Sequence, residues 1–187
     1  MQKVFPPRVQ QFIGGKPMRM TSKRAPALDR IDIKILALLQ RDGRSTIQKL
    51  AERVGLSARP CLERVRRLEA AGIIAGYRAV IAVEQLSRPV TVFAQIAVEK
   101  QVHREQLVRR LRAIEDVVEC WEVSGNVDYL ARFVCADVAR YEALTTELIE
   151  DQSLGVARII SHIGLRTIRN FAGYPDSLLT PTQPKLR

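Results

Sequence analysis

Residues 54–69 read VGLSARPCLERVRRLE, and this stretch decides the fold of the front part of the chain. Gly55 suits the left-handed position that follows the end of a helix. Ser57 is a favourable N-cap for the next helix, and Pro60 falls in its first turn, where a missing amide costs little. The stretch therefore predicts two helices joined by a tight turn, the second of them rich in arginine.

The sequence on both sides extends the helical pattern. Apolar residues recur at i, i+4, i+7 and i+8 over residues 31–39, which predicts a first amphipathic helix. Ser45 followed by Gln48 has the spacing of a capping box and predicts the start of the second helix, while the third runs over residues 57–71. This arrangement is the helix-turn-helix signature, and residues 73–83 are expected to form a wing or hairpin. A helical bundle with an exposed charged face is the alternative.

Positive charge is concentrated in the front of the chain. The 187 residues include 30 Lys or Arg and 20 Asp or Glu, a formal net charge of +10. Residues 1–27 hold six basic groups and no acidic one, residues 28–76 hold ten and six, and residues 77–187 hold fourteen of each. A basic front half predicts contact with a polyanion. Double-stranded DNA is favoured over an anionic membrane, because residues 1–27 contain no basic amphipathic helix.

Composition argues against several other classes of protein. No run approaches the ~18 apolar residues of a membrane-spanning helix. Three cysteines and two histidines are too few and too scattered for a disulfide framework or a metal site. No motif supplies a nucleophile or an acid–base pair. We therefore expect a cytoplasmic protein that is not an enzyme and that needs no metal or cofactor.

The back half has a different pattern. Strands are predicted over residues 90–98, 117–123, 129–135 and 156–168, and helices over residues 103–114 and 138–150. The order β-α-β-β-α-β is that of a ferredoxin-like domain. Helices on one side leave the other face of the sheet open, with Phe93, Gln95 and Ala97 on it, and a partly apolar open face is a candidate dimer interface.

Two motifs resemble the Lrp/AsnC family, the feast/famine regulators. The first is Leu28-Asp29-Arg30-Ile31-Asp32 together with residues 54–69, and the second is the turn Ser124-Gly125-x-x-Asp128-Tyr129. The resemblance covers residues 28–168. It implies an α+β protein in which an N-terminal winged helix-turn-helix domain precedes a C-terminal ferredoxin-like βαββαβ domain of the RAM/AsnC type.

The resemblance also implies which residues meet DNA and a small effector. DNA contacts are expected at Ser45, Gln48, Ser57, Ala58, Arg59, Arg64, Arg66 and Arg67. An effector, typically an amino acid, is expected at Ser124, Gly125, Asn126, Val127, Asp128 and Tyr129. Trp121, three residues before the turn, is a further candidate for the pocket lining, with a core or interface aromatic as the alternative. Turn amides suit a carboxylate and Asp128 suits an ammonium group, although an ordinary hairpin capped by Asp128 is the alternative. Asn126 stands where many relatives carry a carboxylate, which leaves the charge class of the effector open.

These observations predict a sequence-specific transcriptional regulator of amino-acid metabolism genes whose assembly or DNA affinity responds to the effector. The resemblance implies a homodimer that assembles further to an octamer. An architectural DNA-organising protein without a ligand response is the alternative. The expected parts are a flexible basic arm (1–27), the winged helix-turn-helix domain (28–76), a linker strand (77–89), the ligand-binding and oligomerisation domain (90–170) and a loose tail (171–187).

Overall fold

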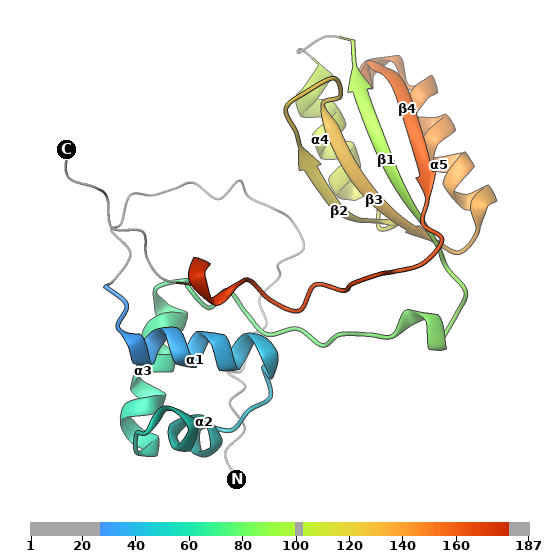
Figure 1. Ribbon diagram of the computed structural model, residues 1–187. Helices are drawn as coiled ribbons and strands as arrows, with labels where there is room; N and C mark the ends of the chain where they lie inside the picture. Colours follow the sequence, from blue (N-terminus) through green and yellow to red (C-terminus); the bar gives the residue numbers. More distant parts are fainter. Residues whose placement is uncertain (1–26, 100–102, 180–187) are drawn as a thin grey trace, which may run out of the picture. The chain divides into compact units, whose positions relative to one another are not determined.

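The computed structural model describes residues 27–99 and 103–179, which form two compact units (Figure 1). One unit contains residues 27–80 and 170–179, and the other contains the described part of residues 81–169. The predicted basic arm, apart from Ala27, and residues 180–187 of the predicted tail lie outside the described residues. No helix in the described ranges is both long enough and apolar enough to cross a membrane.

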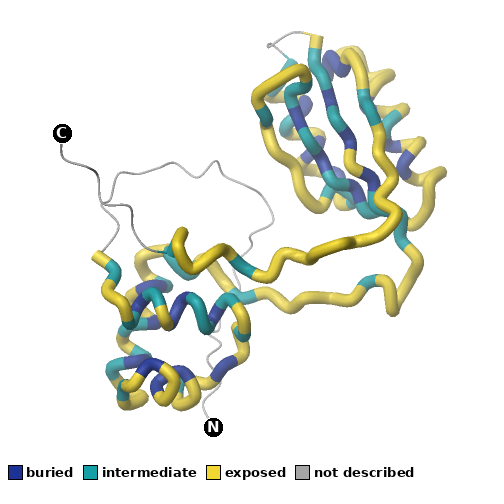
Figure 2. The backbone as a smooth tube through the Cα atoms, in the orientation of Figure 1, coloured by how far each residue is buried: buried dark blue, intermediate teal, exposed yellow. Residues whose placement is uncertain are grey.

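The first unit is built from three helices. They are α1 (Arg30–Arg41), α2 (Ile47–Val54) and α3 (Ala58–Ala70). Their apolar faces meet in a single core, in which Ile35, Leu50, Cys61 and Leu68 are almost completely buried (Figure 2). The predicted periodicity therefore gives the correct helices and most of the correct buried positions.

The ends of these helices follow from their terminal residues. Gly55 ends α2 with φ of 75° and ψ of 38°, as predicted for a left-handed position. Ser57 occupies the N-cap of α3. A complete capping box lies at the start of α1, where the Asp29 side chain accepts from the Asp32 N–H and the Asp32 side chain accepts from the Asp29 N–H.

The capping box predicted at Ser45 and Gln48 is wrong. Thr46 is the N-cap of α2, and its hydroxyl accepts a hydrogen bond from the Lys49 N–H at 3.3 Å. Ser45 is buried, and its hydroxyl donates to Asp42 Oδ2 at 2.9 Å. The preceding turn therefore uses the Ser45 side chain, which leaves the next hydroxyl along the chain to cap the helix.

The predicted wing or hairpin over residues 73–83 and the predicted linker strand within residues 77–89 are also wrong. The described chain has no strand there, and its regular structure is a 3-10 turn at Val83–Gln85. A strand requires a hydrogen-bonded neighbour, and this segment pairs with no strand among the described residues. Tyr77 fixes the start of the segment, because its hydroxyl donates to Glu69 Oε1 at 2.9 Å and its ring packs on the helical core.

The described part of the predicted loose tail lies against the helical unit instead. The Gln40 side chain donates to the Tyr174 carbonyl and accepts from the Tyr174 N–H, both at 2.9 Å. Arg41 forms an ion pair with Asp176 at 3.4 Å, and Leu179 packs on the core of the three helices. Residues 170–179 therefore form a C-terminal strap. The sequence did not predict it, because its partners Gln40 and Arg41 lie far away in the chain, at the end of α1.

The second unit is a four-stranded antiparallel sheet with two helices. Its elements are β1 (Val90–Val98), α4 (Arg104–Ala113), β2 (Val117–Glu122), β3 (Tyr129–Cys135), α5 (Val138–Glu150) and β4 (Val156–Ile163). The strand order β2-β3-β1-β4 is the ferredoxin-like arrangement that the sequence predicts. Both helices cover the same face of the sheet (Figure 1).

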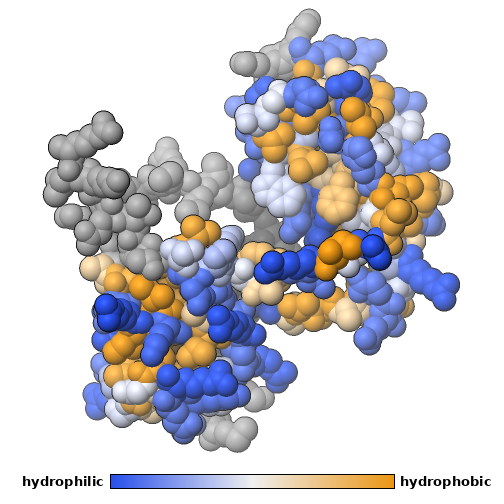
Figure 3. Space-filling model, viewed as in Figure 1, coloured by the Kyte–Doolittle hydropathy of each residue, from blue (hydrophilic) through white to orange (hydrophobic). Residues whose placement is uncertain are grey.

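Burial alternates along the two central strands (Figure 2). Val92, Ala94 and Ile96 of β1 are buried beneath the helices, whereas Phe93 between them is 40% exposed. The register places Phe93 opposite Arg132 of β3 and His162 of β4, so these side chains share the face without helices. That open face carries a mixture of apolar and polar side chains (Figure 3).

Candidate functional site

The turn between α2 and α3 has the geometry of a helix-turn-helix. The Leu56 N–H donates to the Ala51 carbonyl at 2.9 Å, which closes the end of α2 around the left-handed Gly55. Leu56 also packs partly on the common core. These contacts fix the angle at which α3 leaves the turn.

One face of α3 presents cationic side chains to solvent. The Arg59 side chain is 91% exposed and makes one loose ion pair with Glu63 at 3.4 Å. Arg66 is exposed and has no ion pair among the described residues. The two residues lie seven apart, which is about two turns, so they share a face of the helix. Of the other residues expected at DNA, Gln48, Ser57 and Ala58 are exposed as well, whereas Ser45 is buried.

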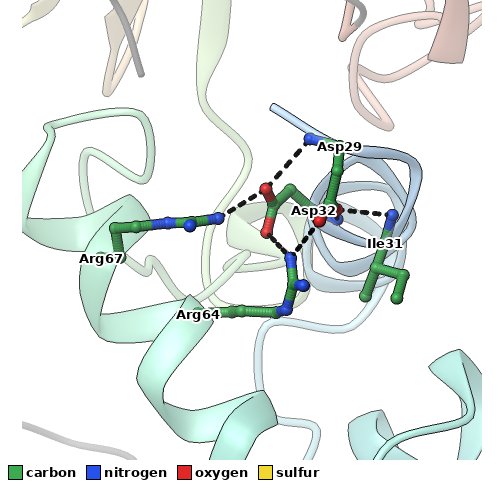
Figure 4. A network of polar contacts seen from close by, with 5 residues as sticks. All are labelled: Asp29, Ile31, Asp32, Arg64 and Arg67. Atoms are coloured by element: carbon green, nitrogen blue, oxygen red, sulfur yellow. Dashed lines mark hydrogen bonds and ion pairs between the residues drawn. The ribbon is translucent and has the colours of Figure 1, made fainter. Parts of the chain in front are cut away.

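The two remaining arginines of α3 are engaged within the protein (Figure 4). Arg64 Nη1 donates to Asp29 Oδ2 at 2.6 Å and to Asp32 Oδ1 at 2.9 Å. Arg67 Nη2 donates to Asp32 Oδ2 at 2.6 Å. Asp32 is fully buried, while the Arg64 side chain is 26% exposed and the Arg67 side chain 49% exposed. Both arginines therefore bind carboxylates of α1, whereas Arg59 has only a loose partner on its own helix.

These contacts also shift ionisation. The pKa of the Asp29 carboxyl is lowered, first by the hydrogen bond from the Asp32 N–H and then by the Arg64 guanidinium. The Arg64 pKa is raised by the same carboxylates. The charged forms of Asp29 and Arg64 therefore stabilise each other, and the network ties the first turn of α1 to the middle of α3.

The turn expected to hold an effector lies between β2 and β3. Ser124, Gly125 and Asn126 are exposed at its tip, and Gly125 has φ of 131°, a conformation that side chains rarely adopt. The Val123 N–H donates to the Asp128 carbonyl at 2.9 Å and closes the turn. The tip amides are consequently presented to solvent on a closed loop.

Asp128 is held more firmly than an exposed turn residue. Its Oδ2 accepts from the Val98 N–H at 2.8 Å, and its backbone N–H donates to the Ile96 carbonyl at 2.9 Å. Its Oδ1 accepts a hydrogen bond from Arg104 of α4, which also donates to Glu122 at 3.0 Å. Both carboxylate oxygens of Asp128 therefore have partners within the protein.

The other residues expected at the effector are spread over two faces of the sheet. The Tyr129 side chain is 2% exposed and belongs to the core beneath the helices. Trp121 is 48% exposed and lies opposite Leu130 on the open face. Val127 is half-buried. The structure thus groups residues 124–128 in one turn, but it places the side chains of Trp121 and Tyr129 on opposite faces of the sheet.

A separate pocket of about 350 Å³ lies on the helical side of the sheet unit. Four of its charged lining residues form two ion pairs, Arg110 with Glu147 at 2.7 Å and Arg140 with Asp116 at 3.0 Å. Because these groups satisfy one another, the pocket offers a ligand no unpaired charge from either pair.

Sequence reasoning missed two residues at these sites. Asp32 gave a signal, since a carboxylate in the first turn of α1 suits the helix end, but its contact with α3 spans 32 residues. Arg104 stands 24 residues before its partner Asp128 in the chain. No short spacing rule connects residues that only the folded chain brings together.

Comparison with known protein families gives two matches that together cover most of the described residues. Residues 28–75 match the model described as winged helix-turn-helix DNA-binding, and residues 91–172 match the model described as Lrp/AsnC ligand binding domain. The boundary between the two matches falls in the segment that connects the helical unit to the sheet unit.

Individual relatives extend over both units. The chain is 42% identical over 147 residues to the transcriptional regulatory protein DoeX of Halomonas elongata, covering 76% of this chain and 90% of that protein. It is 45% identical over 128 residues to the leucine-responsive regulatory protein of Haemophilus influenzae, covering 67% of this chain and 77% of that protein.

Solved structures show the same architecture. An AsnC family transcriptional regulator from Agrobacterium tumefaciens is similar with a TM-score of 0.73 at 30% identity, over 81% of this chain and 99% of that chain. A Neisseria meningitidis transcriptional regulator in complex with L-Met has a TM-score of 0.73 at 31% identity, over 82% and 99%.

Proposed function

The chain belongs to the Lrp/AsnC family of DNA-binding transcriptional regulators, which are not enzymes, and from this premise we propose how it acts. Its α3 reads operator sequence, and a small effector bound by the sheet unit changes assembly or DNA affinity. The effector is an amino acid and the regulated genes serve amino-acid metabolism. The single observation that carries the DNA-binding assignment is the exposed face of α3, which presents Arg59 and Arg66 while Arg64 and Arg67 are paired with carboxylates of α1.

The exposed residues of the helix-turn-helix have two different proposed roles at DNA, contact with base edges and contact with the phosphate backbone. Arg59 stands at the start of α3, where recognition helices approach base edges, and its long exposed side chain suits the acceptors of guanine. Arg66 lies two turns further along and suits the phosphate backbone, which adds affinity without reading sequence. Gln48, Ser57 and Ala58 complete the proposed contact surface. Ser45 supports the turn from within.

For the effector, we propose the exposed tip Ser124-Gly125-Asn126. Its backbone amides suit a carboxylate, and Asn126 offers amide hydrogen bonding where a charged residue would offer a countercharge. The similarity to a regulator in complex with L-Met supports an amino acid as the ligand class. Because Asp128 already binds Arg104 and Val98, its proposed duty is to hold the loop rather than to meet an ammonium group.

The open face of the sheet is the proposed dimer interface. Phe93, Trp121, Leu130 and Ile160 all lie on it, and Phe93 and Trp121 are 40% and 48% exposed. Apolar side chains on a face without helices suit contact with a second copy. In such a dimer, two α3 helices contact two half-sites of the DNA. The dimers assemble further into octamers in the cytoplasm.

The proposal is tested by measuring binding of the purified protein to its own upstream DNA and to random duplex, with and without each of the twenty amino acids. Arg59→Ala should weaken upstream binding much more than random binding, because a base contact carries sequence information. Glu105→Ala, an exposed residue of α4, serves as the control. Equal loss on both duplexes would assign Arg59 to phosphate contact. Specific binding that no amino acid alters would contradict the proposed effector class and favour an architectural role.

A further inference from the structure

The ion network between α1 and α3 has a geometry that bears directly on DNA recognition (Figure 4). Asp32 is 0% exposed, and each of its carboxylate oxygens accepts a hydrogen bond from a different arginine of α3. Arg64 and Arg67 lie about one helical turn apart, so Asp32 contacts α3 at two positions along the helix axis. Asp29 adds a second carboxylate to Arg64 at 2.6 Å.

We propose that Asp32 is a positioning residue for DNA recognition, which fixes the rotation of α3 and holds Arg64 and Arg67 away from DNA. The inference rests on the proposed function, because α3 must be the reading helix. Arg59 and Arg66 are then left to meet the duplex. Asp32 itself touches no DNA and acts through the two arginines.

Helix geometry explains why two contacts are needed. One side-chain contact allows a helix to pivot about it, whereas two contacts a turn apart oppose both rotation and sliding. A rotation of α3 by one residue would carry Arg59 through about 100° and remove it from a base edge. The buried Val65 and Leu68 set which face of α3 turns toward the core, and the two contacts with Asp32 add directional constraints on its exact rotation within that packing.

The network also affects the charge that α3 presents to DNA. The carboxylates of Asp29 and Asp32 balance the guanidinium groups of Arg64 and Arg67, so the network as a whole adds little to the attraction of α3 for phosphate. If Asp32 lost its charge, Arg67 would lose its carboxylate partner in the network. Its side chain is already 49% exposed and would become available to DNA of any sequence.

The test uses the full chain carrying Asp32→Asn, which keeps the shape of the side chain and removes its charge. Affinities for upstream and random duplex are measured over a range of salt concentrations, with circular dichroism to give the folded fraction. We expect the ratio of upstream to random affinity to fall by about tenfold or more. The salt slope for random DNA should steepen by about one as one further phosphate contact forms.

Asp176→Asn is the matched control. It removes one carboxylate and one ion pair with α1 in the same unit, but Asp176 contacts Arg41 rather than α3. The control should change neither the affinity ratio nor the salt slope. A proportional loss of both affinities in Asp32→Asn, matching a loss of folded protein, would overturn the positioning role.

Arg67→Gln provides a second variant that leaves Asp32 bound to Arg64. A positioning arginine predicts a lower affinity ratio with an unchanged salt slope, whereas an arginine at phosphate predicts a slope shallower by about one with an unchanged ratio, which would overturn the assignment. Wild-type protein that binds all duplexes equally would contradict the proposed function itself. Wild-type specificity that survives both substitutions would contradict the positioning role alone.

Discussion

Replacing Asp128 by alanine should destabilise the sheet unit, and not simply remove a ligand contact. The carboxylate joins three elements, since it accepts from Val98 of β1 and from Arg104 of α4 while its own residue begins the return into β3. Its side chain is 19% exposed, so water replaces these partners only in part. Alanine would release both contacts at once.

The magnitude follows from the two contacts. A backbone N–H donating to a charged acceptor, as from Val98 at 2.8 Å, contributes about 1.5–3 kcal/mol. The ion pair with Arg104 adds about 0.5 kcal/mol, discounted because the Arg104 side chain is 36% exposed. We therefore expect Asp128→Ala to lower the free energy of unfolding of this unit by about 2–3.5 kcal/mol.

The chain contains one tryptophan, Trp121, and it lies on β2 of the same unit. Its fluorescence during urea unfolding therefore reports this unit, at a fixed protein concentration because assembly affects apparent stability. With a urea dependence of about 1 kcal/mol per molar, the midpoint should fall by about 2–3.5 M. Glu122→Ala removes the other, 63% exposed partner of Arg104 and should change the stability by less than about 0.5 kcal/mol.

A midpoint for Asp128→Ala within 0.3 M (about 0.3 kcal/mol) of the wild type would refute this reasoning, since the carboxylate would then hold nothing together. The result also decides how the effector site is probed. If Asp128 is structural, its loss abolishes any ligand response indirectly. Substitution at the exposed Asn126 then gives the cleaner test of ligand contact.

Three further results are expected. Gln40→Ala removes both contacts to Tyr174, so amide hydrogen exchange in residues 170–179 should accelerate; unchanged exchange would mean that the strap is held elsewhere. The folded-state pKa of Asp29 is lowered, so its contacts stabilise the helical unit above the ordinary carboxyl pKa of about 4 and are lost as the pH falls below it; urea midpoints at several pH values should show this loss, and Asp29→Asn should reduce it. A thiol reagent at pH 8 should modify the exposed Cys120 first and Cys135 last, because burial raises the pKa of Cys135 to about 11, and Cys120→Ser should abolish the fast phase.

Local rules predicted most of the fold. The observed limits of β1, β3 and α5 coincide with the predicted ranges. In each of these elements the strand or helix spacing of apolar residues extends from one end to the other. The strand β4 ends at Ile163, five residues before the predicted end at residue 168. Continuing apolar residues alone do not make a strand, since β1, its partner, pairs with β4 only as far as Ile163.

The C-terminal strap shows where local rules fail. Pro175, Pro181 and Pro184 predict a loose segment, and nothing near them in sequence offers a partner. The Gln40 amide reproduces the donor and acceptor of a neighbouring strand for a single residue, Tyr174. A side chain can satisfy a backbone in this way from anywhere in the chain, so only the folded structure identifies the pair.

Contacts between residues distant in sequence also distinguish the arginines of α3 at the DNA-binding site. Arg59, Arg64, Arg66 and Arg67 are equivalent in a count of charges, and the family resemblance assigns DNA contacts to all four. The structure separates them, because α1 places two carboxylates beside Arg64 and Arg67 and leaves Arg59 with one loose partner on its own helix. The net positive charge of the helical unit therefore overstates the number of free cations on its reading helix. A prediction of DNA affinity from charge alone would count two guanidinium groups that the fold has already neutralised.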